Sequence, residues 1–326
     1  MNAWFIRHLL PLATAVVLAG LYLLGILSFS GFGKLSVVAN LIGDNAVLGV
    51  AAIGMTFVIL SGGIDLSIGA VVACASTLLA TLVADGMHPL PAMALTVLAG
   101  AVFGLMQGGL IVRYRLPPFL VTLAGMFLAR GLAFCLQRQS LAIHHPFLSD
   151  TINQGLTIPL GGPGGFTAAA SVAAALTLLA HAAATWTTAG RCVYAIGDDE
   201  ASARLMGLPV SPVKLLVYTL AGACGGLAGV LFASYTQSGD PAALVGFELD
   251  AIAAVVIGGT LLRGGVGSVL GTGMGVLILG LIQTLITFKG DLSSWWTRIV
   301  IGVLVLVFIL LQDAIAILTR RMLARR

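Results

Sequence analysis

A single carboxylate, Asp65, stands between two strongly apolar segments of the chain. An acidic side chain near the middle of a membrane-spanning helix costs roughly 2.5–3.5 kcal/mol on insertion scales. Gly62 and Gly63 precede it and weaken a helix, and backbone groups freed at membrane depth are tolerated only inside protein or beside water. The stretch therefore predicts a helix that breaks or ends beside an internal path. An equally compatible alternative is that Asp65 caps the next helix at the membrane edge, with help from Ser67.

Other polar side chains suit the recognition of a neutral, hydroxyl-rich solute such as a monosaccharide. Such a solute needs amides, hydroxyls and carboxylates for hydrogen bonds, with aromatic rings to cover its faces. The candidates in or at the ends of the apolar segments are Asn45, Thr56, Phe57, Asp65, Ser67, Gln107, Tyr235, Gln237, Glu248, Asp250 and Gln283. As a set they are candidates for lining a translocation path, although any one of them could instead be a helix cap or an interhelical hydrogen bond. Asp44 and Asp250 begin apolar segments and could simply favour a positive helix N-terminus.

The sequence offers little for catalysis, metal binding or nucleotide binding. His144 and His145 are adjacent, but no third ligand follows at a useful spacing, and the four cysteines are scattered singly. No Ser/His, paired Asp or zinc-ligand pattern appears on neighbouring segments, which argues against an enzyme. The chain also lacks a G-x-x-x-x-G-K-[ST] phosphate loop, so ATP-driven work would require the nucleotide on another chain. We therefore expect no metal and no cofactor in this chain.

Composition indicates the class of protein. Of the 326 residues, 59% are hydrophobic and only 9% are charged, whereas soluble domains carry about 25% charged residues. The sequence pI of about 9.1 could suggest nucleic-acid binding. The basic residues lie in short loops and tails, however, so membrane topology explains them better and nucleic acid is not an expected partner. The prediction is an all-α polytopic protein in contact with membrane lipid.

Apolar segments of suitable length predict about ten transmembrane helices. They are residues 9–29, 44–60, 64–83, 91–112, 119–136, 166–186, 213–235, 250–262, 266–288 and 295–317. Residues 30–43 are expected to form a short connection. Gly100, Gly104 and Gly108 recur every four residues, a pattern typical of a small-residue face for close helix packing.

Basic residues are distributed unequally between alternate connections. One side would hold Arg7, Arg113, Arg115, Arg191, Arg204, Lys214, Arg263 and the four arginines of the C-terminal tail; the other would hold Lys34, Arg138 and Lys289. By the positive-inside rule this predicts that both termini are cytoplasmic. Residues 137–165 would then form a periplasmic loop, and residues 187–212 would face the cytoplasm.

Part of the sequence echoes itself at an offset of 202 residues. LSGGIDLSIG at Leu60–Gly69 matches LRGGVGSVLG at Leu262–Gly271, including Gly62, Gly63 and Gly69 with their partners. The echo could record a duplicated half, or it could be a chance match between segments rich in small residues.

The segment 194–208 has the features of a short helix between two spans. Asp198 or Asp199 could cap its start, and Gly207 could end it. We expect one helix over residues 195–207, with a small apolar face that includes Ala203 and Leu205. Such a helix suits docking into a partner's groove, whereas the alternative is an ordinary solvated loop.

Three stretches resemble the signatures of a known family. GMTFVILSGGIDLSIGA (54–70), YAIGDDEASARLMGL (194–208) and VVIGGTLLRGGVGSVLGT (255–272) look like the signature stretches of the ribose/galactose-type permeases of bacterial ABC importers. The resemblance covers nearly the whole chain, and the order and spacing are those of the family. ELDAIAAVVIGGTLLRGG (248–265), with LIQTLI and LSSWWTRI downstream, is especially similar to the galactofuranose importer permeases.

This resemblance implies one permease domain over residues 1–326, with a type II-like importer architecture, in the bacterial inner membrane. It also implies a periplasmic sugar-binding protein, a second permease subunit that is identical or paralogous, and cytoplasmic ATP-binding subunits that hold ATP and Mg. Coupling to the ATPase would fall to residues 194–208, namely Tyr194, Gly197, Asp198, Glu200, Ala203, Arg204, Leu205 and Gly207. Asp198 and Asp199 depart from the Gly/Asn-type residues common in relatives, which puts the details of that contact in doubt.

Two functions of different classes are compatible with these features. The first is the permease subunit of an ABC importer for galactofuranose or a related pentose or hexose. The second is a secondary transporter or channel for a small polar solute, which would be active without an ATPase chain. The sequence leaves the sugar open, because the external binding protein sets most of the specificity in such importers.

Overall fold

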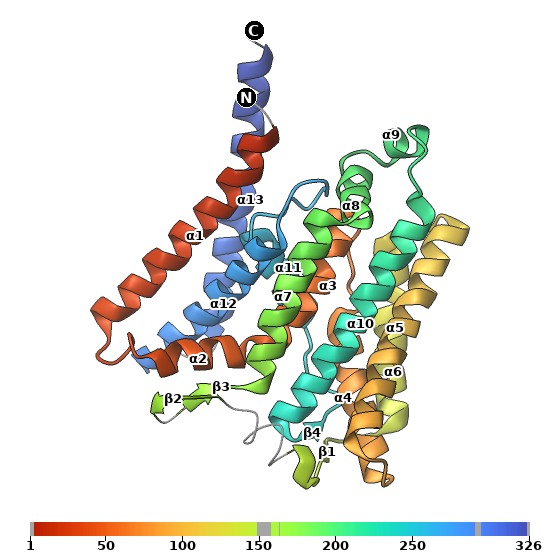
Figure 1. Cartoon of the computed structure of the whole chain (residues 1–326), viewed down its shortest axis with the longest axis vertical. Helices are drawn as coiled ribbons and strands as arrows, with labels where there is room; N and C mark the ends of the chain where they lie inside the picture. The colour runs from red at the N-terminus through yellow and green to blue at the C-terminus, as the bar shows by residue number, and fades with distance from the viewer. Residues whose placement is uncertain (1–2, 149–157, 163, 291–294, 325–326) are drawn as a thin grey trace.

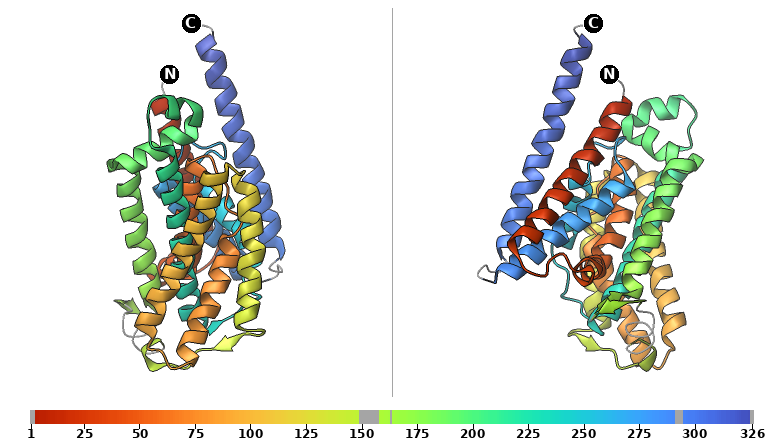
Figure 2. Two further views of the ribbon diagram at one scale, coloured as in Figure 1. Left: turned by 90° about the vertical axis from the view of Figure 1, so that its right-hand side faces the viewer. Right: turned by 60° about the vertical axis from the view of Figure 1, so that its left-hand side comes forward.

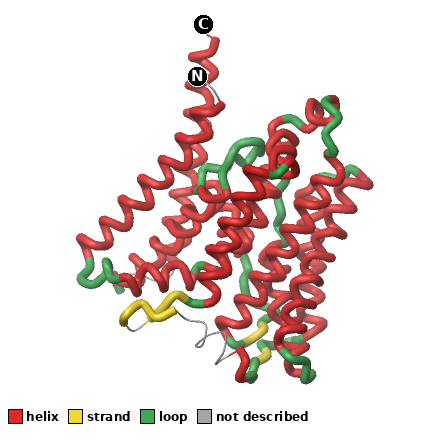
Figure 3. The backbone as a smooth tube through the Cα atoms, in the orientation of Figure 1, coloured by secondary structure: helices red, strands yellow, loops and turns green. Residues whose placement is uncertain are grey.

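Long helices make up most of the molecule, and strands are confined to two short antiparallel pairs (Figures 1 and 3). The computed structural model describes residues 3–148, 158–162, 164–290 and 295–324. The strand pairs join β1 (Leu141–Ala142) to β4 (Ser238–Gly239) and β2 (Ile158–Gly162) to β3 (Gly164–Phe166). The prediction of an all-α polytopic membrane protein is confirmed.

Six helices in the described part of the chain are long and apolar enough to cross a membrane. They are α1 (Ala3–Ser28), α5 (Pro89–Tyr114), α6 (Pro118–Leu136), α7 (Ala168–Trp186), α10 (Val210–Thr236) and α12 (Val269–Lys289). A bent pair, α2 (Leu35–Asp44) and α3 (Ala46–Leu60), would make a seventh span. The apolar helices α4 (Ile68–Ala84) and α13 (Trp295–Ala324) complete the long elements. The figure of ten spans is not confirmed and stays a prediction.

The expected short connection over residues 30–43 is wrong, because most of it is helix α2. This helix buries Ala39, Leu41 and Gly43, and it lies across the direction of the neighbouring helices (Figure 1). The chain then turns by 53° into α3. The break falls at Asn45, which has non-helical backbone angles and whose side chain donates a hydrogen bond to the carbonyl oxygen of Leu41 at 2.8 Å. The predicted span 44–60 is therefore the second part of a bent pair.

Two expected spans differ from the helices that the structure shows. The chain is non-helical over residues 61–67 before α4 begins, and again in most of residues 237–246 before α11 (Phe247–Ile257). The helix expected at residues 64–83 therefore begins at Ile68, and the one expected at 250–262 runs from Phe247 to Ile257. The non-helical residues 237–246 agree with the connection that the predicted spans leave between 235 and 250. Gly62 and Gly246 adopt positive φ angles of 81° and 84°, which a helix cannot accommodate. The 11 residues of α11 would extend only about 16 Å, less than the thickness of a membrane core.

The N-terminal ends of α4 and α11 meet inside the molecule. A Cβ atom on Gly69, in the first turn of α4, would lie 2.6 Å from Oε2 of Glu248 and 3.3 Å from Cβ of Phe247. Both ends carry positive helix-dipole charge. The carboxylates of Glu248 and Asp65, one beside each end, offset that charge. The predicted helix break beside Asp65 is therefore confirmed, and the fold pairs it with a second break.

Close packing of α5 on α10 uses the glycines that the sequence singled out. A Cβ atom on Gly104 would overlap the carbonyl oxygen of Tyr218, and one on Gly100 would overlap that of Gly222. A Cβ atom on Gly108 would lie 3.1 Å from Cβ of Tyr218. The predicted small-residue face is confirmed, since the two backbones approach to a distance that leaves no room for side chains.

The two ends of the molecule differ in what they carry (Figures 1 and 2). Helix α1 begins and α13 ends at the same end as α8 (Thr188–Asp198) and α9 (Glu200–Leu205), which we call the α8–α9 end. The four short strands lie at the opposite end, the β end. This arrangement agrees with the predicted topology, and the assignment of the α8–α9 end to the cytoplasm stays a prediction. Residues 149–157 and 163 of the predicted periplasmic loop lie outside the described residues.

Substituting Gly104 should therefore destabilise the fold through backbone overlap. We expect Gly104→Leu to lower the free energy of unfolding by about 1–3 kcal/mol or more, because the carbonyl of Tyr218 cannot rotate away as a side chain can. The matched control is Gly109→Leu on the same helix, where no atom lies within 4 Å of the Cβ position. Thermal unfolding of the purified chain in detergent measures both variants. An equal loss of stability in the two would contradict the packing argument.

Candidate functional site

A cavity of about 490 Å³ opens between α2, α10 and α12. We call it the polar pocket. It brings together three of the predicted path residues, Asn45, Tyr235 and Gln283. It is lined by Val37, Asn40, Leu41, Asp44, Asn45, Tyr235, Gly280, Gln283, Thr284, Thr287 and Phe288. Amide, carboxylate and hydroxyl groups thus face one space together with two aromatic rings.

The bend between α2 and α3 positions the acidic corner of the polar pocket. Asp44 ends α2, and its Oδ1 atom accepts a hydrogen bond from the hydroxyl of Tyr235 at 3.4 Å. Asn45 follows at the bend, where Gly280 of α12 has no side chain and so lets the Asn45 amide approach the helix. Sequence reasoning treated Asp44 only as a charge at a helix start, because the bend that turns it toward Tyr235 depends on tertiary packing.

A second cavity, of about 510 Å³, adjoins the polar pocket and shares Gln283 and Thr287 with it. Its other polar lining includes Asp250 from α11 and Arg298 from α13. The guanidinium carbon of Arg298 lies 5.5 Å from the centre of the Trp295 ring. The two cavities together place a charged pair of opposite sign beside a group of amides and hydroxyls. Such a surface can offer many hydrogen bonds to a neutral polyol.

A separate polar cluster surrounds Asp65. Its Oδ1 atom accepts hydrogen bonds from the backbone N–H of Ser67 at 2.8 Å and from the Ser67 hydroxyl at 2.6 Å. The amide of Gln107, on α5, donates to the Ser67 hydroxyl at 3.0 Å. Asp65 is only 3% exposed, so these bonds compensate for part of its desolvation. The cluster holds the non-helical segment against α5 and lies apart from the polar pocket.

A charged residue of α6 fixes the second non-helical segment. Arg130 donates hydrogen bonds to the carbonyl oxygens of Pro241 at 2.7 Å and Ala243 at 2.6 Å. These carbonyls lack the partners that a helix would supply, so the guanidinium replaces the missing backbone hydrogen bonds. Sequence reasoning did not include Arg130 among the site residues. The available signal was an arginine inside an otherwise apolar predicted span.

The remaining predicted path residues lie outside both cavities. Thr56 is buried, and its hydroxyl bonds to that of Thr272 at 2.8 Å between α3 and α12. Phe57 is part of a buried apolar cluster. Gln237 donates to the carbonyl oxygen of Ser234 at 2.6 Å where α10 ends. Glu248 lies at the meeting point of α4 and α11. The structure thus groups some of the predicted residues and separates others.

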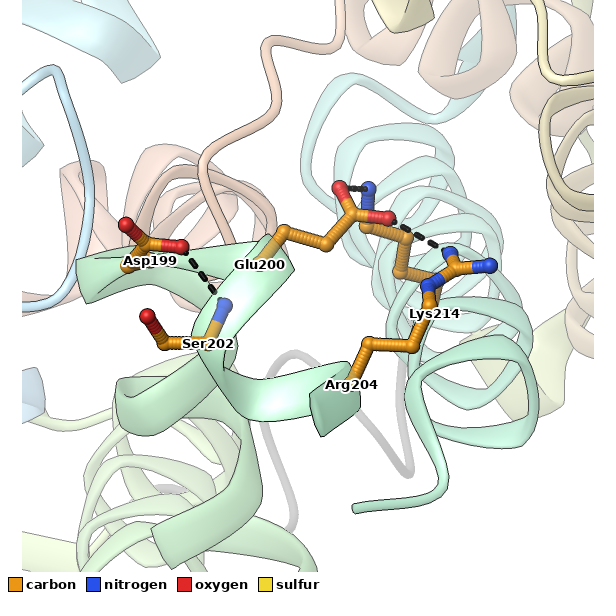
Figure 4. A network of polar contacts seen from close by, with 5 residues as sticks. All are labelled: Asp199, Glu200, Ser202, Arg204 and Lys214. Carbon is orange, nitrogen blue, oxygen red and sulfur yellow. Dashed lines mark hydrogen bonds and ion pairs between the residues drawn. The ribbon is translucent and has the colours of Figure 1, made fainter. Parts of the chain in front are cut away.

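The segment 194–208 forms parts of two helices, so the expected single helix over residues 195–207 is wrong. Helix α8 ends at Asp198, and α9 begins after Asp199, whose extended backbone breaks the run. The Asp199 carboxylate accepts a hydrogen bond from the backbone N–H of Ser202 at 2.8 Å (Figure 4). Gly207 has a φ of 77° and follows the end of α9, as predicted. The broken geometry makes α9 a separate six-residue helix.

The apolar face expected on this segment also needs correction. Ala203 is fully buried, whereas Leu205 is 89% exposed. Ala203 packs into a cluster with residues of α8 and α10, so it fixes α9 to the protein and is not accessible to a partner. Leu205 and Met206 are the apolar side chains that α9 and its end present outward.

Backbone contacts join α8 to the two echoed loops. The N–H of Gly265 donates to the carbonyl oxygen of Leu60 at 3.1 Å, and a Cβ atom on Gly264 would lie 2.8 Å from the backbone nitrogen of Gly62. Gly197 of α8 lies against both loops, since a Cβ atom there would overlap the Leu60 carbonyl. We call these five residues the glycine junction. Both loops occupy equivalent places between α3 and α4 and between α11 and α12, which supports a duplicated half.

Comparison with known proteins gives consistent matches over almost the whole chain. Residues 37–309 match the family described as branched-chain amino acid transport system / permease component. The chain is 46% identical to the inner membrane ABC transporter permease protein YjfF of Escherichia coli K12, over 96% of this chain and 95% of that protein. No solved structure gives a significant match.

Two import permeases are also similar to the chain. Identity is 36% with the fructose import permease protein FruG of Bifidobacterium longum, over 95% of this chain and 92% of that protein. Identity is 38% with the ribose import permease protein RbsC of Bacillus subtilis, over 84% of each chain.

Neutralising Asp65 should weaken the first helix break. We expect Asp65→Asn to lower the free energy of unfolding by roughly 1.5–3 kcal/mol, because hydrogen bonds from Ser67 to a charged group become bonds to a neutral one. Solute uptake by cells that express this variant should also fall. The control is Asp85→Asn at the exposed end of α4. Unchanged expression, thermal stability and uptake in the Asp65 variant would show that the carboxylate is a dispensable cap.

Proposed function

The chain belongs to the family of branched-chain amino acid transport system permease components, and we propose that it is the membrane-spanning subunit of a bacterial ABC importer that moves a monosaccharide. It is a permease component of a sugar ABC transporter and a multi-pass protein of the bacterial inner membrane. The observation that carries the proposal is the full-length similarity to ribose and fructose import permeases. No catalytic role is proposed for the chain itself.

Import would be powered by ATP hydrolysis on a separate subunit. The chain has no phosphate loop of its own, so an ATP-binding subunit with ATP and Mg is required. A periplasmic sugar-binding protein would deliver the solute to the β end. A second permease subunit, either another copy or a paralogue, would complete the path.

The polar pocket supports a sugar as the transported solute. Its amides, hydroxyls and carboxylate can bond to the hydroxyl groups of a neutral sugar, and Tyr235 and Phe288 can cover an apolar sugar face. No cluster of cations that would select an anionic solute lines this pocket within the described residues. The resemblance of residues 248–265 to galactofuranose importer permeases makes galactofuranose the first sugar to test, ahead of ribose and fructose.

Coupling to the ATPase would pass through α9 and the glycine junction. Leu205 and Met206 are exposed at the α8–α9 end, where a cytoplasmic subunit can reach them. Gly197 links α8 to both echoed loops through backbone contacts, and backbone transmits displacement better than flexible side chains do. A push on α9 would therefore reach the starts of α4 and α12.

Sugar uptake into proteoliposomes tests the transport proposal. The complex of permease, ATP-binding subunit and binding protein should accumulate radiolabelled galactofuranose only with ATP and Mg on the ATPase side. Gln283→Leu should reduce uptake roughly 2- to 10-fold, the effect of losing one or two hydrogen bonds to the sugar. The control is Gln139→Leu, which replaces an exposed amide outside both cavities. Uptake by the permease alone, driven by an ion gradient, would instead indicate a secondary transporter.

A charge on the exposed face of α9 tests the coupling route. We expect Leu205→Asp to leave thermal stability unchanged, because this side chain is 89% exposed, while co-purification with the ATP-binding subunit falls at least tenfold. Leu35→Asp, at an exposed position of α2 near the β end, is the matched control. Ala203 is unsuitable for this test because it is buried. Normal assembly and transport by Leu205→Asp would place coupling elsewhere.

A further inference from the structure

A basic cavity of about 600 Å³ lies at the α8–α9 end, between the α5–α6 turn, α9 and the start of α10. We call it the basic pocket. Four cationic side chains line it, Arg113, Arg115, Arg204 and Lys214, together with one carboxylate, Glu200. The basic pocket and the polar pocket share no lining residue. Of the charged residues of the basic pocket, Glu200 and Arg204 belong to the segment expected to couple to the ATPase, whereas Arg113, Arg115 and Lys214 have no role in the proposed function.

The charges in the basic pocket are only partly balanced. Glu200 accepts hydrogen bonds from Arg204 at 3.0 Å and from Lys214 at 2.5 Å (Figure 4). The hydrogen bond from Lys214 lowers the pKa of the Glu200 carboxyl, so this group is ionised at neutral pH and holds both cations in place. Arg113 and Arg115 make no ion pair within the part of the chain that the structure describes. The cavity therefore carries an excess of positive charge.

The basic pocket lies at the ends of two candidate membrane spans. Arg113 lies in the last turn of α5, and Arg115 caps it in a left-handed conformation with φ of 55°. Both helices that meet at this turn, α5 and α6, are candidate spans. Phe119 and Leu120, in the first turn of α6, are 48% and 56% exposed and directly follow Pro118, which lines the cavity.

We propose that the basic pocket binds the phosphate headgroup of an anionic phospholipid such as phosphatidylglycerol. Arginine side chains bind phosphate oxygens through paired hydrogen bonds. Basic pockets between spanning helices at a membrane surface suit anionic headgroups, whose acyl chains can pack on the adjoining apolar side chains. A bound headgroup would cross-link the α5–α6 turn to α9 and α10, and would hold α9 at a fixed height above the membrane.

Two simpler roles for the same charges predict different behaviour. Arginines that act only as topology signals need no cavity and should show no preference for one lipid over another. If the basic pocket instead docks an acidic segment of the ATP-binding subunit, changing the arginines should release that subunit and leave lipid binding unchanged. The continuity of the cavity with exposed Phe119 and Leu120 favours lipid, because an aqueous protein partner gains nothing from a membrane-facing apolar rim.

Lipid selectivity of the full-length chain tests the proposal. The chain is placed in nanodiscs of phosphatidylcholine with a small fraction of spin-labelled phosphatidylglycerol, and the motionally restricted fraction is measured. The double variant Arg113→Gln/Arg115→Gln should weaken binding roughly 30-fold, given about fivefold for each surface arginine. The matched control is Arg138→Gln/Lys289→Gln, which removes two exposed cations near the β end. The control should keep full selectivity for phosphatidylglycerol. Arg113→Lys/Arg115→Lys, which keeps both positive charges, should keep most of it.

Further measurements separate the outcomes. An excess of inorganic phosphate should compete only weakly, because it lacks the acyl chains; complete competition would indicate a soluble phosphate ligand and overturn the proposal. Photoactivatable phosphatidylglycerol should label residues 111–118 and 210–214 of the unaltered protein, which requires no variant to fold. Unchanged selectivity in the glutamine variant, or absence of that labelling, would overturn the proposal. Loss of the ATP-binding subunit with unchanged lipid binding would identify a protein-docking surface.

Discussion

The need to satisfy backbone polar groups inside the membrane controls this structure at two places. Helix α4 and helix α11 each begin in the interior after a non-helical segment, and every freed N–H or C=O there requires a partner within the protein. At the first break, Asp65 accepts a hydrogen bond from the N–H of Ser67 and Thr122 donates one to the carbonyl oxygen of Ile64; at the second, Arg130 donates to two carbonyl oxygens. The two helix starts face each other across Gly69 and Glu248. Such interrupted helices are a recurrent way to build a polar site within a membrane protein.

These breaks divide the molecule into regions with different tasks. The polar pocket lies where the α2–α3 bend meets α10 and α12. One echoed loop is the break before α4 and the other precedes α12, and both lie against α8. The glycine junction connects those loops through backbone atoms, which leaves no side chain to absorb a displacement. In the coupling that we propose, a movement of α9 would pass through these contacts to the starts of α4 and α12.

Another region of the molecule is packed through direct backbone contact. Helices α5 and α10 approach through Gly100, Gly104 and Gly222 until their backbones touch, so they behave as one unit. The basic pocket is attached to this unit, because α5 and α10 both contribute to its lining. The headgroup that we propose would fasten α9 to the same unit, at the level of the membrane surface.

The sequence by itself determined the class of protein and the helix break beside Asp65. Composition excludes a soluble domain, and apolar length sets most spans, because the bilayer demands both whatever the tertiary fold. The glycines around Asp65 disclosed the first break, since their backbone freedom is a local property. The small-residue face of α5 was equally visible, because its spacing follows from helix geometry alone.

Only the tertiary structure decided which residues share a site. Asn45, Tyr235 and Gln283 come from three separate helices, and they meet because α2 bends at Asn45 and packs on Gly280. Residues 30–43 were expected to form a connection, but in the folded protein most of them form helix α2, which is partly buried. Ala203 was expected to face a partner, but α8 and α10 bury it. Long-range packing produces these outcomes, and no local pattern encodes it. The predicted spans left residues 236–249 as a connection before α11, but they could not show that Arg130 stabilises this segment from a distant part of the chain.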